Sequence, residues 1–124
     1  MHIPKQPEAS EEIKLARKEV LDWERDNRTS LNRASLDGMC CWQATDTSPG
    51  CAVGRLCTPE QQAGLAGMTN GDDPVHFLPA HVVRLGRPFL HHLQNLHDCP
   101  ENWTDKGLSK MGTRNWDALY KAFV

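Results

Sequence analysis

The chain has 124 residues and an apolar share of 39%, which suffices for one modest core and not for several. We expect a flexible N-terminal tail over residues 1–9, followed by a single compact domain over 10–124. The net charge of −2 is too small for the basic surface that neutralises nucleic-acid phosphates. The sequence contains no apolar run of membrane-spanning length and no apolar stretch of a secretory signal. We therefore expect a cytosolic protein that binds neither nucleic acid nor membrane.

The first helix is predicted over about 11–26. Ser10 is a favoured N-cap residue, and the carboxylates of Glu11 and Glu12 suit the positive end of the helix dipole. Apolar residues recur at helical spacing on one face, and charged residues fill the other face. The predicted apolar face consists of Ile13, Ala16, Val20 and Trp23.

The middle of the chain is less distinctive. Residues 39–57 hold two short apolar runs separated by the turn-forming cluster 45–50. A short β-hairpin at about 39–57 and a strand followed by one helical turn fit this pattern equally well. Thr58 then begins another helix, with Pro59 at its first position and Gln61 completing a capping box.

Helices separated by glycine and proline are predicted for the second half. A short helix over 79–85 ends at Gly86, and a longer one covers about 88–98. Thr104 and Thr113 resemble the N-caps of two final helices. The last helix carries Trp116, Leu119, Tyr120 and Phe123 at helical spacing. The whole pattern predicts a mainly α fold, a small single-domain helical bundle.

The five cysteines are spaced irregularly. Structural zinc sites favour closely spaced pairs such as C-x-x-C, which this chain lacks. We therefore predict buried free thiols, no metal ligands and no cofactor, and keep a metal-stabilised structural module as the weakest alternative. The cysteines are Cys40, Cys41, Cys51, Cys57 and Cys99.

One cysteine is a candidate nucleophile. Cys51 follows Gly50 and would gain thiolate character at the start of a helical turn. His97 could act as its base, with Asp98 or Asp72 as the orienting carboxylate, as in cysteine-dependent hydrolases and transferases. Asp98 is adjacent to His97, however, and neighbours on a helix point in different directions. No complete catalytic motif is present, which favours a protein that is not an enzyme.

Residues 40–104 resemble a loose group of small phage and prophage proteins. These proteins carry a C-x-Y…C-A-[VI]-G-x-L segment and a later L-Q-x-[IL]-H-D segment. The corresponding residues here are 51–56, 93–98 and the following Trp103, with Trp42 in place of the tyrosine. The resemblance implies a viral origin and the bacterial cytosol as the place of action, and it transfers no catalytic role.

Three functions remain as hypotheses. The first is a small phage-type protein that binds a host bacterial protein and modulates or inhibits it. Its contact surface would use exposed aromatic side chains, because aromatics anchor protein interfaces. The second is the cysteine-dependent enzyme, and the third is the metal-stabilised module. The candidate contact residues are Trp23, Trp42 and Tyr120.

Overall fold

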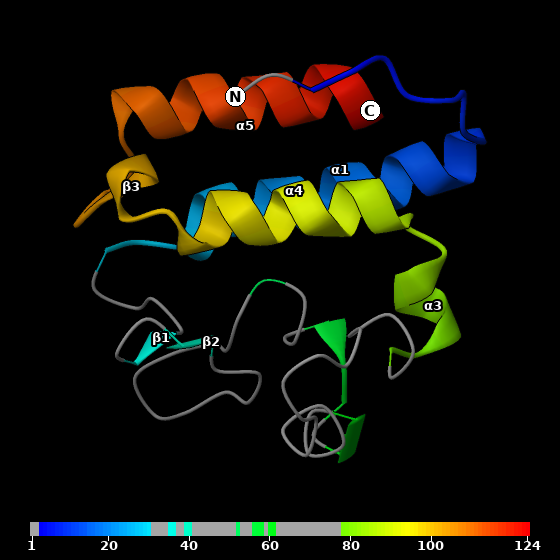
Figure 1. Cartoon of the computed structure of the whole chain (residues 1–124), viewed down its shortest axis with the longest axis horizontal. Helices are drawn as coiled ribbons and strands as arrows, with labels where there is room; N and C mark the ends of the chain where they lie inside the picture. The colour runs from blue at the N-terminus through cyan, green and yellow to red at the C-terminus, as the bar shows by residue number, and fades with distance from the viewer. Residues whose placement is uncertain are drawn as a thin grey trace.

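The computed structural model describes residues 3–30, 35–36, 39–40, 52, 56–58, 60–61 and 78–124. Helices predominate among them, which confirms the mainly α prediction. The three long helices are α1 (Glu11–Asn27), α4 (Arg87–Asp98) and α5 (Lys110–Phe123), and they pack against one another. In Figure 1, α1 and α4 run in the same direction and α5 runs back alongside them. No helix in the described ranges is long and apolar enough to cross a membrane.

Two antiparallel hairpins and two short helical turns complete the described part. The β1–β2 hairpin begins ahead of the predicted span of 39–57, and most of residues 41–57 lie outside the described residues. The second hairpin, β3–β4, separates α4 from α5. The short elements are α3 (Ala80–Val83), η3 (Pro100–Asn102), β1 (Ser35–Leu36), β2 (Met39–Cys40), β3 (Trp103–Thr104) and β4 (Gly107–Leu108).

Local capping residues determine where the helices begin. The Ser10 hydroxyl accepts the Ile13 N–H at 3.3 Å at the start of α1, as predicted. Thr58 and Gln61 form the predicted capping box, with contacts of 2.9 and 3.3 Å. Before α4, Gly86 has φ +97°, a backbone conformation that favours glycine, and so it separates α3 from α4.

The C-terminal third differs from the prediction of two helices capped by Thr104 and Thr113. Thr104 lies in β3, and α5 is the one helix after it. The true N-cap is Ser109, whose hydroxyl accepts the Gly112 N–H at 3.0 Å. The turn before it depends on Gly107 at φ +128°, which lets two short strands pair where a helix was expected.

The buried face of α1 matches the predicted apolar stripe only in part, through Ala16 and Val20, which pack against the core. Ile13, Ala16, Val20 and Trp23 are only half-buried, whereas Leu21 and Glu24 are buried, as is the C-cap residue Arg28. The expectation that charged residues fill the outer face therefore does not hold for Glu24, which is buried. Leu21, Glu24 and Arg28 follow a spacing of three and four, so they share the face that meets α4 and α5. A carboxylate and a guanidinium can occupy it because each has a partner there.

The N-terminal segment has no regular secondary structure from residue 3 to residue 10. Ile3 packs against the core, and the Lys14 ammonium pairs with the Glu8 carboxylate. The flexibility expected for residues 1–9 stays a prediction. The core itself combines apolar side chains from α1, α3, α4, β3 and α5, together with two residues from the middle of the chain. Its buried members are Leu21, Ala52, Cys57, Val82, Leu85, Phe89, Leu90, Leu93, Leu96, Trp103, Trp116, Leu119 and Phe123.

Close approach of α5 to η3 depends on Gly112. A Cβ at Gly112 would lie 2.0 Å from the Asn102 carbonyl oxygen, far inside van der Waals contact. The same oxygen accepts the Ser109 N–H at 2.9 Å, so it cannot move away without cost. The absence of a side chain at Gly112 therefore lets the N-terminus of α5 seat against η3.

We predict that Gly112→Ala destabilises the fold by at least about 2 kcal/mol, because overpacking against backbone outweighs the better helix propensity of alanine. Urea unfolding followed by circular dichroism measures the change. Arg114→Ala, at an exposed position of the same helix, is the matched control and should leave the midpoint nearly unchanged. A Gly112→Ala protein as stable as the parent would refute the close contact.

Candidate functional site

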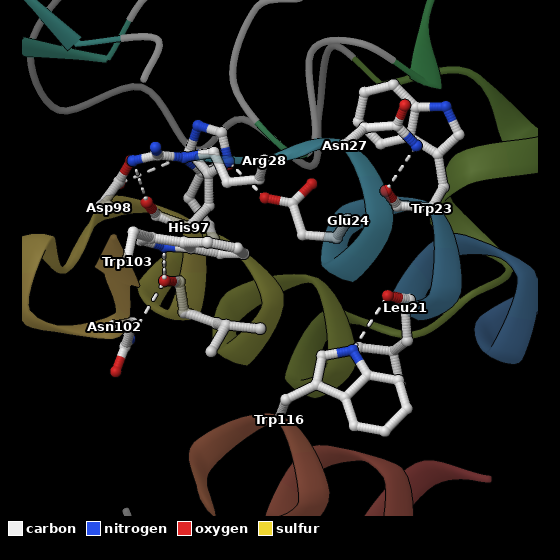
Figure 2. Close-up of polar contacts among 12 residues, drawn as sticks. Leu21, Trp23, Glu24, Asn27, Arg28, His97, Asp98, Asn102, Trp103 and Trp116 are labelled. Atoms are coloured by element: carbon white, nitrogen blue, oxygen red, sulfur yellow. Dashed lines mark hydrogen bonds and ion pairs between the residues drawn. The ribbon is translucent and has the colours of Figure 1, made fainter. Parts of the chain in front are cut away.

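A buried carboxylate–imidazole pair joins α1 to α4. Glu24 is 0% exposed and His97 is 2% exposed. The Glu24 Oε1 atom contacts the His97 Nδ1 atom, although the two residues lie 73 positions apart in the chain. Figure 2 shows the Glu24 carboxylate pointing toward the His97 ring. The pair is the most enclosed polar contact between the two helices.

The pair also defines the state of the other ring nitrogen. An ionised carboxylate only accepts hydrogen bonds, so Nδ1 of His97 donates in this contact whenever Glu24 is ionised. In the neutral ring, Nε2 then carries a lone pair. That atom is buried and has no hydrogen-bond partner among the described residues. An imidazole oriented in this way presents a proton acceptor inside the protein.

Arg28 closes the C-terminal end of α4 beside this pair. Its Nη2 atom donates to the His97 carbonyl at 3.1 Å, and its guanidinium lies 4.9 Å from the centre of the Trp103 ring. The last carbonyls of a helix lack partners within the helix and carry partial negative charge. A buried cation is therefore favoured at this position. The stacking on Trp103 adds a cation–π contact (Figure 2).

The preceding carbonyl of α4 receives two further donors. Asn102 Nδ2 and Trp103 Nε1 both donate to the Leu96 carbonyl, at 3.1 and 2.9 Å. Both donors come from the segment that directly follows α4, so the chain folds back over the helix end. Trp103, Asn102 and Arg28 together enclose the last turn of α4, on which His97 lies.

Of the predicted catalytic residues, His97 and Asp98 are described, and the first is buried whereas the second is exposed. His97 is buried, and its ring contacts Glu24. Asp98 is exposed and accepts from Gln94 Nε2 at 3.0 and 3.1 Å. Cys51 lies outside the described residues. Sequence reasoning missed Glu24, although its position three residues after Leu21 on a helix was a usable signal.

The predicted contact residues lie on different sides of α1. Trp23 is half-buried, and Figure 2 shows it on the opposite side of α1 from Trp116. Tyr120 is half-buried on α5 and stacks on Trp116, with 5.3 Å between the ring centres. Trp42 lies outside the described residues. Trp23 and Tyr120 therefore do not form one aromatic patch.

The remaining thiol and imidazole groups give no metal site in the described part. Among those residues, no three His, Cys, Asp or Glu side chains come together as metal ligands would. Cys99 donates its S–H to Glu101 at 2.9 Å. This hydrogen bond, together with burial, raises the pKa of the Cys99 thiol. Cys99 is therefore a poor nucleophile at neutral pH.

His92 occupies the edge of the core. Its ring lies 5.9 Å from the Phe123 ring and 5.6 Å from the His91 ring. Burial, and then the charge of His91, lower the pKa of His92 from 6.5. The folded protein therefore holds His92 in its neutral form more strongly than the unfolded chain does.

Comparison of the chain with protein-family models, with curated proteins and with solved structures gave no match. The functional argument consequently depends on the geometry of the described residues.

We predict that His92 makes stability fall as the pH drops below about 6.5, because the unfolded chain then binds a proton that the folded protein resists. Urea midpoints at about pH 7.5 and about pH 5.5 should differ more for the parent than for His92→Gln. Equal acid sensitivity of the two proteins would show that His92 has no such effect.

We predict that Glu101→Gln speeds alkylation of Cys99 at neutral pH, since removing the carboxylate lowers the pKa of the thiol and increases its thiolate fraction. Iodoacetamide labelling followed by peptide mass spectrometry measures the rate. The exposed Lys106→Gln variant serves as a control for nearby surface change. An unchanged Cys99 rate in Glu101→Gln would contradict the hydrogen bond.

Proposed function

We propose that this chain is a small phage-type protein that binds a host bacterial protein and modulates or inhibits it. The support comes from two sources. Residues 40–104 resemble small phage and prophage proteins, and the buried contacts of Glu24 and Arg28 with His97 join α1 to α4. The observation that carries the proposal is a half-buried aromatic side chain on α5, Tyr120, whose ring stacks on Trp116.

The surroundings of Tyr120 suit an interface. Its ring stacks on Trp116, and the Arg25 guanidinium lies 4.9 Å from the centre of the Trp116 ring on the other helix. Lys18 and Asp22 form an ion pair at 2.7 Å along the same side of α1. Leu15 precedes them on this side and is 58% exposed. Rigid aromatics next to arginine are typical of residues that dominate binding energy.

Substitution of Tyr120 tests this surface. The tagged parent protein should capture a host protein from bacterial lysate in a fixed ratio, and Tyr120→Ala should weaken that complex by about tenfold or more. Tyr120→Phe keeps the stacked ring and should retain most of the affinity. Lys121→Ala, at an exposed position beside it, should leave capture unchanged.

Two results would count against this proposal. Capture of no protein in a fixed ratio would remove the binding function. Equal affinity of Tyr120→Ala and the parent would remove this surface, and Trp23→Ala would then test the opposite side of α1. Thermal melting of each variant ensures that a loss of capture reflects the surface and not unfolding.

A cysteine-dependent hydrolase or transferase is the second candidate function. The specific observation in its favour is the contact between Glu24 and Nδ1 of His97, because a base in such enzymes is oriented by a third group at its other nitrogen. Its predicted nucleophile, Cys51, lies outside the described residues. Asp98, the orienting group expected from the sequence, hydrogen-bonds Gln94.

A further inference from the structure

The lysines and arginines of α1 all have partners within the chain. Arg17 donates to two backbone carbonyls, and each of the other three lies within ion-pair distance of a carboxylate. The positive charges of this helix are therefore balanced by groups of the protein itself. The ion pairs are Lys14 with Glu8 and Glu11, Lys18 with Asp22, and Arg25 with Asp22 and Asp26.

The cations at the start of α5 are arranged differently. Lys106 lies in the turn between β3 and β4, Lys110 is the first residue of α5, and Arg114 follows one helical turn later. All three are exposed, and none forms an ion pair within the described part of the chain. The carboxylates closest to them in sequence, Asp105 and Asp117, are exposed and make no ion pair there either. We call Lys106, Lys110 and Arg114 the basic patch.

Helix stability does not account for the basic patch. Lys110 and Arg114 are four residues apart, so they lie on the same face of α5, where two like charges destabilise a helix. The first turn of α5 also contains no acidic residue, although carboxylates are favoured at that position. In Figure 1 the β3–β4 hairpin, which carries Lys106, lies at the end where α5 begins. Three uncompensated cations therefore gather at one end of the molecule.

We propose that the basic patch binds an acidic segment of the host protein. The inference rests on the proposed binding function and names the chemistry of its partner. Cations that lack carboxylate partners within their own chain are complementary to carboxylates of another protein. Met111, next to Lys110, is 51% exposed and offers an apolar contact beside the charges. Its flexible side chain adapts to partners of different shape.

A nucleic acid suits the basic patch less well. Binding to a phosphate backbone needs many clustered cations, and this patch contains three. The net charge of the whole chain is −2, which repels a long polyanion. A short acidic segment places a few carboxylates at the patch and keeps the rest of the partner away from the negative charges of the protein.

Lys121 lies outside the basic patch, although it is also an exposed cation of α5. It occupies the last turn of the helix, where the unpaired carbonyls carry partial negative charge and offset its own charge. The positive surface is therefore confined to the beginning of α5. Lys121 consequently provides a matched control within the same helix.

The test measures binding of a fluorescently labelled oligoglutamate peptide to the full-length protein, with oligoglutamine as the neutral probe. We expect oligoglutamate to bind at about 0.05 M salt and to dissociate at about 0.5 M, because salt screens exposed charges. The variant with Lys110→Gln and Arg114→Gln should bind about fivefold more weakly, since each exposed ion pair contributes little. The control with Lys5→Gln and Lys121→Gln loses the same charge at exposed positions and should bind like the parent.

Three results would overturn the inference. The first is equal binding of oligoglutamate and oligoglutamine by the parent protein, and the second is equal binding of oligoglutamate by the parent and by Lys110→Gln with Arg114→Gln. The third is tighter binding of duplex DNA than of oligoglutamate, which would assign the basic patch to phosphate. Thermal melting by circular dichroism ensures that each variant is folded, as expected for substitutions at exposed positions.

Capture from bacterial lysate separates this inference from the proposed function. Oligoglutamate binding through the basic patch, together with no captured host protein, would remove the proposed function and leave the preference of the patch for acidic peptides. A host protein captured equally well by the parent and by Lys110→Gln with Arg114→Gln would retain the function and overturn the role of the patch. Support for both requires that this variant weakens capture and that the control variant does not.

Discussion

The last carbonyls of α4 have no hydrogen-bond donors within their own helix, and the described part of the molecule is organised around supplying them. A buried helix end needs donors for its last carbonyls. Here Leu96 receives donors from Asn102 and Trp103, and the His97 carbonyl receives the guanidinium of Arg28. These donors come from both sides of α4 in the sequence, so satisfying one helix end places α1 and the β3 strand around it. The burial of Arg28 follows from this requirement.

A second arginine, Arg17, binds carbonyls just before the start of α4 and at the C-terminal end of α5. Arg17 donates from Nε to the Leu85 carbonyl at 2.8 Å and from Nη1 to the Phe123 carbonyl at 3.2 Å. Its guanidinium also lies 5.6 Å from the centre of the Phe89 ring. Burial of the group lowers the pKa of Arg17, and arginine tolerates this because it stays charged across the physiological range. Two arginines thus hold α1 to its neighbours, Arg17 at the C-terminal end of α5 and the C-cap residue Arg28 at the C-terminal end of α4.

The sequence predicted what depends on neighbouring residues and missed what depends on distant ones. The start of α1 at Ser10 and the capping box of Thr58 are local hydrogen bonds, and both were predicted. The burial of Glu24 was not, because hydropathy assigns a carboxylate to solvent unless its partner, 73 residues away, is known. The error at Thr104 had a local cause. A threonine can cap a helix or pair in a strand. Here the positive φ of Gly107 allows the chain to turn back, so that Thr104 pairs in a strand. For the candidate site, His97 was predicted and its orienting residue was not.

The long sequence separation of the Glu24–His97 contact has a consequence for the order of folding. α4, η3, the β3–β4 hairpin and α5 are consecutive and contact one another, so they can form with only short loops to close. α1 reaches His97 only after the whole intervening chain has been closed into a loop, which costs more conformational entropy. We therefore expect a folding nucleus in residues 87–124. Docking of α1 would be the late step, which brings the Glu24 carboxylate into contact with the His97 imidazole.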